Sequence, residues 1–255
     1  MSGLLSVPRP EKGNALFLIL IAIALFAALS YAIAYSQRSG GNNITHEQEA
    51  LAASRMIQYS GEMAQAVTRL KLIGGCTDAT LNFYSAKFAT PTDYSNAAAP
   101  ADHSCDVFDT AGRNVTWQAP PPFTQSDPDY GVTSNGSEYL ITGQLMVNGI
   151  GTNTSNSAAS QEITLFTHVT QNICIAINKA LNIPNPGGFP VTVGLTGFSI
   201  PSVTAEAIGA GFNNATVKLV AFTAGTGNPQ LLSQTSGCYY TGDGFFNFYS
   251  VLLPR

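Results

Sequence analysis

The chain has 255 residues, a formal net charge of −4 and only 10% charged residues, while Gly, Ser, Thr and Asn are abundant. Beyond residue 71 it carries five basic and eleven acidic residues, so it has no basic stripe and nucleic acid is not an expected partner. This composition is typical of an extracellular β-rich domain and not of a disordered tail.

The first expected element is a transmembrane helix over residues 14–36. Its core, Ala15 to Ala34, contains no charged residue, Pro or Gly. Twenty helical residues cover about 30 Å, which is the thickness of the hydrocarbon core of a bilayer. We therefore expect a single-pass protein with a lipid bilayer as partner and a cytoplasmic leader at 1–13, because Arg9 and Lys12 precede the span.

A cleaved signal peptide is the alternative for this segment. Ala32-Ile33-Ala34 would suit signal peptidase. However, the apolar region of a signal peptide usually has about 7–15 residues, and this one has twenty without interruption. The length favours a retained anchor.

A hinge and a second helix are expected next. Ser39 to Asn43 contains a Gly-Gly pair, so residues 37–44 are predicted to form a hinge. Thr45 and Gln48 fit a capping box, and apolar and small residues at steps of three and four predict an amphipathic stalk helix over 45–75. Gly74-Gly75 is the expected stop. The predicted buried face consists of Ala53, Met56, Ile57, Ser60, Ala64, Val67 and Leu70.

Residues 76–255 are expected to form a β-rich domain. Alternating apolar residues and turn signals predict strands at 139–147, 162–167, 191–195, 217–222 and 245–253, and a short helix at 169–182. The predicted fold class is α+β, with the stalk helix packed on an antiparallel sheet.

Four cysteines follow the expected anchor: Cys76, Cys105, Cys174 and Cys238. None has a metal-binding spacing, and an even number outside the cytoplasm indicates two disulfides. Three pairings are possible. We favour Cys76–Cys105 and Cys174–Cys238, because each would link one local region; four free thiols would require a reducing compartment.

No motif predicts an enzyme, a cofactor or a metal centre. His46, His103 and His168 are scattered, and neither a nucleophile elbow nor a zinc-protease motif occurs. Acidic residues cluster without the spacing of a calcium loop, at Asp102, Asp106, Asp109, Asp127 and Asp129. Five glycosylation sequons leave open a eukaryotic type II membrane glycoprotein: Asn43, Asn114, Asn135, Asn153 and Asn214.

The order of the N-terminal features carries a family resemblance. A basic leader, Lys12-Gly13, an uninterrupted apolar helix, an amphipathic helix and a β domain with late cysteines follow one another. This arrangement resembles the type IV pilins and the pseudopilins of type II secretion. The resemblance implies cleavage by a prepilin peptidase between Gly13 and Asn14. Asn14 stands where the family usually has Phe, and Leu18 stands where it has Glu, an acid that some minor, tip-located pseudopilins lack.

The resemblance implies a structural protein and not an enzyme. The apolar helix would hold the precursor in the inner membrane with its domain in the periplasm or outside the cell. It would then pack against like or related pilin subunits in a pilus or pseudopilus. The alternative is a membrane-tethered binding or adhesion module without a filament role, which would use the loops at 97–137 and 149–160.

Overall fold

The computed structural model describes residues 14–87, 94–113, 115–121, 139–147, 149–151, 162–193, 220–221, 229–241 and 244–254. The chain divides into two compact units, Met1–Gln48 and Glu49–Arg255. The elements are the helices α1 (Asn14–Leu72) and α2 (Gln171–Ala180), the short 3₁₀ helices η3 (Pro186–Gly188) and η4 (Pro229–Leu231), and the strands β1 (Leu140–Met146), β2 (Glu162–Val169), β3 (Val191–Thr192), β4 (Val220–Ala221), β5 (Ser236–Tyr240) and β6 (Phe246–Leu253).

One helix occupies the region where two were predicted. Helix α1 is continuous from Asn14 to Leu72, so the predicted break near Ser39 to Asn43 and the capping box at Thr45 are wrong. A Gly inside a helix costs about 1 kcal/mol relative to Ala, which a long helix with hydrogen-bonded turns on both sides can absorb. Bending at 37–44 stays a prediction.

The end of α1 is as expected from the Gly-Gly pair. The helix stops at Leu72, and Gly75 has a φ of +68°. This left-handed conformation favours Gly and turns the chain back, so that the Cys76 N–H donates to the carbonyl of Leu70 at 3.1 Å.

The six strands form one mixed sheet in the order β3-β5-β6-β2-β1-β4. The four central strands pair antiparallel, whereas β3 pairs parallel with β5 and β4 pairs parallel with β1. The predicted antiparallel sheet is therefore wrong at both edges. Each parallel pair is separated by more than forty residues of chain, and such long connections permit parallel pairing.

Most strand positions match the prediction, with one omission. Strands β1, β2, β3, β4 and β6 fall inside or beside the expected ranges, and α2 lies within the expected helix. Val169 belongs to β2 and not to that helix. Strand β5 was not predicted, because its sequence Ser-Gly-Cys-Tyr-Tyr begins like a turn.

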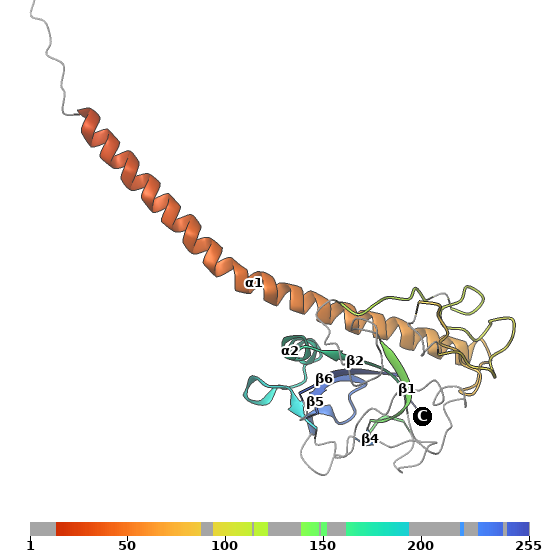
Figure 1. Ribbon diagram of the computed structural model, residues 1–255. Coiled ribbons are helices and arrows are strands. Elements are labelled where there is room, and N and C mark those ends of the chain that lie inside the picture. Colours follow the sequence, from red (N-terminus) through yellow and green to blue (C-terminus); the bar gives the residue numbers. More distant parts are fainter. Residues whose placement is uncertain are drawn as a thin grey trace, which may run out of the picture. The chain divides into compact units, whose positions relative to one another are not determined.

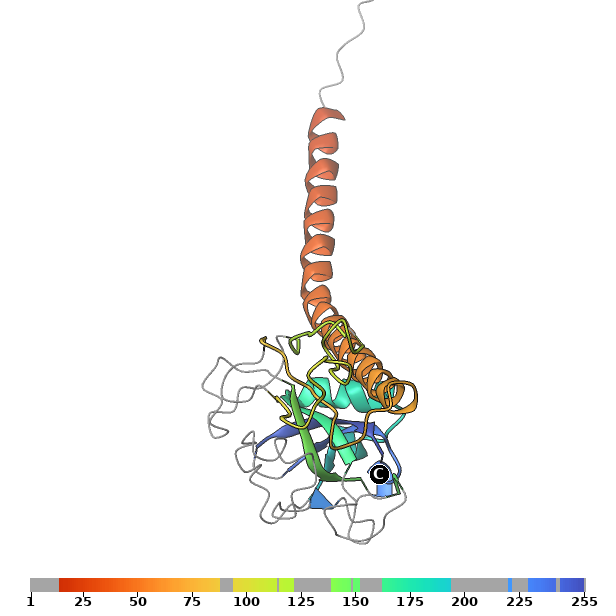
Figure 2. The ribbon, with the colours of Figure 1, turned by 90° about the vertical axis from the view of Figure 1, so that its right-hand side faces the viewer.

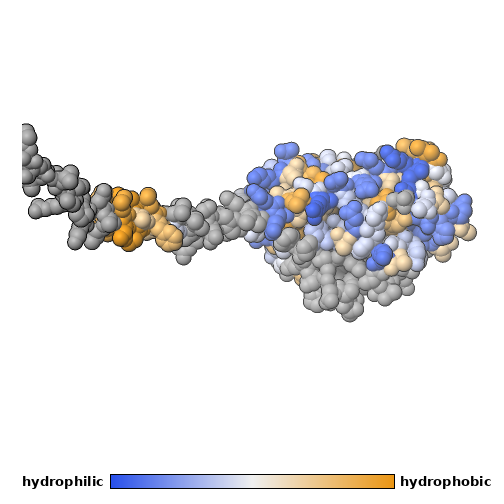
Figure 3. Space-filling model, turned by 90° about the horizontal axis from the view of Figure 1, so that it is seen from above, coloured by the Kyte–Doolittle hydropathy of each residue, from blue (hydrophilic) through white to orange (hydrophobic). Residues whose placement is uncertain are grey.

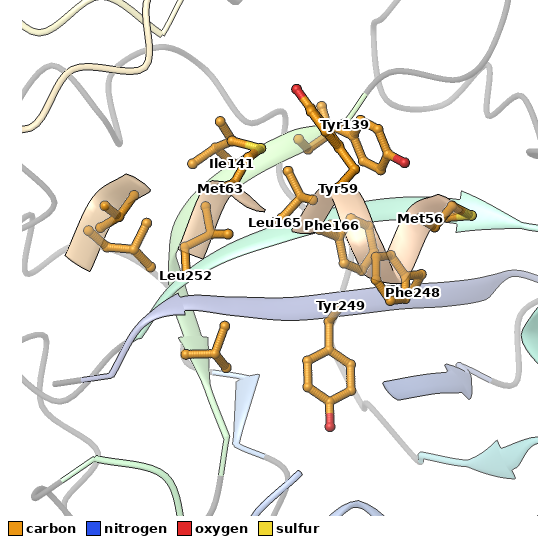
Figure 4. Close-up of a cluster of buried hydrophobic side chains, with 14 of the residues drawn as sticks. Met56, Tyr59, Met63, Tyr139, Ile141, Leu165, Phe166, Phe248, Tyr249 and Leu252 are labelled. Atoms are coloured by element: carbon orange, nitrogen blue, oxygen red, sulfur yellow. The ribbon is translucent and has the colours of Figure 1, made fainter. Parts of the chain in front are cut away.

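The domain portion of α1 and helix α2 lie on the same side of the sheet (Figures 1 and 2). Strand β2 is buried along its whole length and β6 along seven of its eight residues. Met56, Tyr59 and Met63 of α1 cover the face that also carries Leu165 and Phe248 (Figure 4). The fold is thus α+β, with a long helix packed on a mixed sheet.

The opposite face of the sheet is built around tyrosines. Tyr249 points away from α1 (Figure 4), and its ring centroid lies 6.1 Å from that of Tyr239 on the neighbouring strand. Its hydroxyl donates to the carbonyl of Gln234 at 3.0 Å. Gly237 leaves room here, because a Cβ would lie 3.0 Å from Leu231 and 3.1 Å from the Tyr249 ring.

Helix α2 is joined to β5 by a disulfide and by one buried amide. Cys174 of α2 bonds to Cys238 of β5. Asn178, one turn later, receives the Cys238 N–H on Oδ1 and donates Nδ2 to the Cys238 carbonyl, both at 2.9 Å. Asn178 therefore acts as a peptide group added to the edge of β5, and both residues are completely buried.

Candidate functional site

The candidate site is the N-terminal half of α1, in the unit Met1–Gln48. Side chains are described here for residues 17–28, 30 and 45–48. Eight bulky apolar side chains in 17–28 are 40–72% exposed: Phe17, Leu18, Ile19, Leu20, Ile21, Ile23, Leu25 and Phe26. In Figure 3 the described residues of this stretch are orange, whereas the described surface of Glu49–Arg255 is mostly blue and white.

These side chains leave no polar face on this stretch of helix. Successive residues in an α-helix are turned by about 100°, so the five consecutive residues Phe17 to Ile21 already point in every direction. Ile23, Leu25 and Phe26 add to this, and the remaining residues of 17–28 are alanines. A helix that is apolar all round is stable only inside an apolar surrounding, either lipid or other protein.

Several predictions about this region lie outside the described residues. Lys12 and Gly13 of the expected processing site are among them, and Asn14 is described only as the first residue of α1. In the expected span 14–36, the side chains at 14–16, 29 and 31–36 are not described. A search of the described residues finds no helix with the length and apolarity needed to cross a membrane.

The domain portion of α1 is embedded in the core. The predicted buried face is confirmed at Ala53, Met56, Ser60, Val67 and Leu70, while Ile57 and Ala64 are half-buried. Sequence reasoning missed Ala52, Tyr59, Met63 and Ala66, which are also buried. The buried stripe is thus wider than predicted, because the helix is covered by the sheet and also by described residues of the segments 76–87, 94–113 and 115–121. A broader count of large residues at i, i+3, i+4 and i+7 would have included Tyr59 and Met63.

Tyr59 of α1 contacts two other segments, the residue before β1 and the loop that contains Gln118. Its ring centroid lies 5.2 Å from that of Tyr139, just before β1, and its hydroxyl accepts the Gln118 N–H at 3.2 Å. Burial raises the pKa of Tyr59 to about 12, opposed by the Gln118 hydrogen bond. Burial also raises the pKa of Tyr139. Both phenols are therefore neutral at physiological pH.

Polar contacts fix α1 at both ends of its buried portion. At the start, Asn172 of α2 donates Nδ2 to Oε1 of Glu49 at 2.8 Å, and Glu49 is buried. At the end, Arg113 donates Nη2 to the carbonyl of Arg69 at 3.0 Å. Lys71 pairs with Asp78 in the same region. These contacts fix where the domain portion of the helix begins and ends.

The favoured disulfide pairing is confirmed. Cys76 bonds to Cys105 and Cys174 bonds to Cys238, so each bond links one local region. No cysteine of the chain is free. The first bond closes the loop that follows α1, and the second attaches α2 to the sheet. Disulfides of this kind persist in oxidising compartments.

The other candidate residues are not brought together. His46 is exposed on α1, His103 lies in the loop after α1, and His168 is buried on β2 between the rings of Phe166 and Phe245. In the part of the chain that the structure describes, no three His, Cys, Asp or Glu residues could share a metal ion. Asp127, Asp129 and the sequons at Asn114, Asn135, Asn153 and Asn214 lie outside the described residues, as does the side chain of Asn43.

The chain matches no model of a protein family, no curated protein and no solved structure.

Proposed function

We propose that the protein is a pilin-like structural subunit of a type IV pilus or a secretion pseudopilus, held in the inner membrane before assembly. One observation carries the proposal. A single continuous helix has an N-terminal part whose described side chains are apolar on every side and exposed, and a C-terminal part that belongs to the core of a disulfide-bonded domain. The first part needs an apolar surrounding, and the second is part of the domain core.

The energy of covering the exposed half is large. Full burial of one bulky apolar side chain contributes about 1.5–3 kcal/mol, so eight such side chains strongly disfavour a helix surrounded by water. Lipid and neighbouring helices satisfy this requirement about equally. A preference of this helix for neighbouring helices over lipid must then come from close packing. Its small residues allow such packing: Ala22, Ala24, Ala27 and Ala28.

Leu18 favours a minor or tip position for the subunit. In the family that the N-terminus resembles, the acid at this position is thought to pair with the amino terminus of a neighbour. Leu18 cannot accept such a hydrogen bond, and it is exposed on α1 with the other apolar side chains. A subunit without this acid would join other pilin subunits through apolar packing alone.

Processing is tested by the mass of the mature chain. The protein is purified from membranes of cells that contain a prepilin peptidase, and its N-terminus is determined by mass spectrometry. We expect a chain that begins at Asn14. The Gly13→Val variant should keep its leader, whereas Gly3→Val, a matched change within the leader, should still be cleaved. A wild-type chain beginning at Met1 or near Tyr35 would refute the processing step.

Assembly is tested by cross-linking in intact membranes. A single cysteine is introduced in the exposed apolar half, as Ala27→Cys, and separately on the exposed side of the domain portion, as Thr68→Cys. Because the native cysteines are paired, each variant has one reactive thiol. A thiol-specific cross-linker should give dimers with Ala27→Cys in the presence of the assembly machinery. Monomers alone would favour the second candidate, a membrane-tethered binding module.

A further inference from the structure

The loop after α1 contains a buried carboxylate with two different partners. Asp106 is 2% exposed. Its Oδ1 accepts Nδ2 of Asn82 at 2.8 Å, and its Oδ2 lies 2.7 Å from Nδ1 of His103. In this row of three hydrogen-bonded side chains, Asn82 is buried, whereas the His103 side chain is 58% exposed. One end of a buried hydrogen-bonded chain therefore titrates in contact with water.

These three residues organise the loop that the Cys76–Cys105 disulfide closes. Asn82 and Asp106 form a parallel β-bridge, and Oδ1 of Asn82 accepts the backbone N–H groups of Tyr84 and Asn96. The chain segment beyond the disulfide returns over Asp106, where a Cβ on Gly112 would lie 1.8 Å from the Asp106 carbonyl oxygen. Loss of the Asp106 contacts would therefore loosen the loop on both sides of the disulfide.

Arg113, the residue after Gly112, connects the loop to the end of α1. The Arg113 N–H donates to the Asp106 carbonyl at 3.2 Å, and the Arg113 guanidinium donates to the carbonyl of Arg69. Arg69 is in the last turn of the helix. The hydrogen-bonded chain at Asp106 thus supports the attachment of the loop to the C-terminal end of α1.

Among the described residues, the charged groups that act on His103 are the acidic Asp106, Asp109 and Asp102. The hydrogen bond with Asp106 and the charge of that residue raise the pKa of His103, with smaller effects from Asp109 and Asp102. The pKa of Asp102 is lowered, first by the Ser104 side-chain hydrogen bond. Histidine is the side chain type whose ordinary charge change falls between about pH 5 and 8.

We propose that Asn82, Asp106 and His103 form a pH-sensitive latch, which holds the Cys76–Cys105 loop against the end of α1 when His103 is protonated and loosens it as the pH rises. With imidazolium, the buried carboxylate has a charged donor beside it. With neutral imidazole, Nδ1–H can still donate, but the counter-charge is lost, and hydrogen bonds between charged groups are the stronger ones. The proposal is independent of the filament role.

The sign follows from linkage. A group whose pKa is higher in the folded state stabilises that state fully below the pKa of the unfolded chain. This stabilisation is lost as the pH rises through the folded pKa. For His103 the loop should thus be tightest at mildly acidic pH and should open more often above neutrality.

The two disulfides provide an internal comparison for a test. Cys76 and Cys105 are buried, so a reductant reaches them only when the loop opens. The Cys174–Cys238 bond, whose cysteines are completely buried, lies on α2 and β5. The full-length protein in detergent is treated with a limiting amount of a trialkylphosphine at several pH values from 6 to 8.5. Alkylation and mass spectrometry give the reduction rate of each bond. Their ratio removes the pH dependence of the reductant itself.

In the wild type, the ratio of the Cys76–Cys105 rate to the Cys174–Cys238 rate should rise with pH. In His103→Asn the rise should be lost, because Asn offers a neutral donor and tolerates the φ of +60° found at His103. His46→Asn, at an exposed histidine on α1, should behave as the wild type. A flat ratio in the wild type, or an equal rise in His103→Asn, would overturn the proposal.

Discussion

Replacing Asn178 with Ala should destabilise the domain, because the backbone N–H and carbonyl of Cys238 would lose their hydrogen bonds to this side chain. The Asn178 side chain satisfies both the N–H and the carbonyl of Cys238, and all these groups are fully buried. A buried polar group that loses its partner costs about 1–3 kcal/mol, so two orphaned groups predict a loss of about 2–6 kcal/mol. This is a large share of the 5–15 kcal/mol typical of a domain.

The loss can be measured by urea unfolding of the full-length protein in detergent with both disulfides intact. Lys179→Ala is the matched control, since Lys179 is the next residue of α2 and is exposed, and it should change stability by less than about 0.5 kcal/mol. If Asn178→Ala lost less than about 1 kcal/mol, the amide would not be acting as an added peptide group, and the reasoning would be refuted.

Asn178→Asp gives a second view of the same contact. The carboxylate can still accept the Cys238 N–H, but it places a negative charge next to the Cys238 carbonyl. Burial and this carbonyl should raise the pKa of the introduced acid, since only the protonated form can donate. Its folded pKa would then exceed its unfolded pKa, so the variant should be more stable at acidic pH and lose stability as the pH rises.

Four further predictions concern the rest of the domain. Gly112→Ala should lower the melting temperature sharply, because a Cβ there would lie 1.8 Å from a backbone carbonyl oxygen; Gly61→Ala has open space on α1 and should add about 1 kcal/mol of unfolding free energy. Alkaline pH should destabilise the protein, because burial raises the pKa of Tyr59 to about 12 and its stabilising contribution is lost between about pH 10 and 12. A spectrophotometric titration of the tyrosines, compared with unfolding measured at the same pH values, checks this. Replacing both cysteines of a pair by Ser should cost about 3.6 kcal/mol for Cys76–Cys105, with a separation of 29 residues, and about 4.3 kcal/mol for Cys174–Cys238, with 64, in denaturant unfolding.

The sequence was most informative where a single physical cause dominates. Local spacing was enough for the disulfide pairing, and short apolar runs after turn or loop signals were enough for β2 and β6, which are buried strands. The Gly-Gly pair at 40–41 misled, because the helix penalty of Gly is small beside the cooperative hydrogen bonding of a long helix. The parallel edge pairings were not predictable, since they depend on long connections and not on any local pattern.

The polar contacts of the domain were also beyond sequence reasoning. Asn178 looked like one more residue in a short helix, and Asp106 looked like one of several loop carboxylates. Their roles arise from residues up to 60 positions away that folding brings within hydrogen-bond distance. The exposed apolar residues at 17–28, in contrast, could be predicted from the sequence, because an unbroken apolar run needs an apolar surrounding whatever the fold of the rest of the chain.

One face of α1 is buried from Glu49 to Leu70, and this limits where the molecule can be divided. Its inner face supplies part of the hydrophobic core, so pulling this segment off the sheet would expose the same core that global unfolding exposes. Tension applied to the N-terminal half would therefore be resisted by the stability of the whole domain and not by a surface contact. The natural boundary for a truncation lies within a helix, at Glu49, and a domain cut at Gly74 would lose its own core.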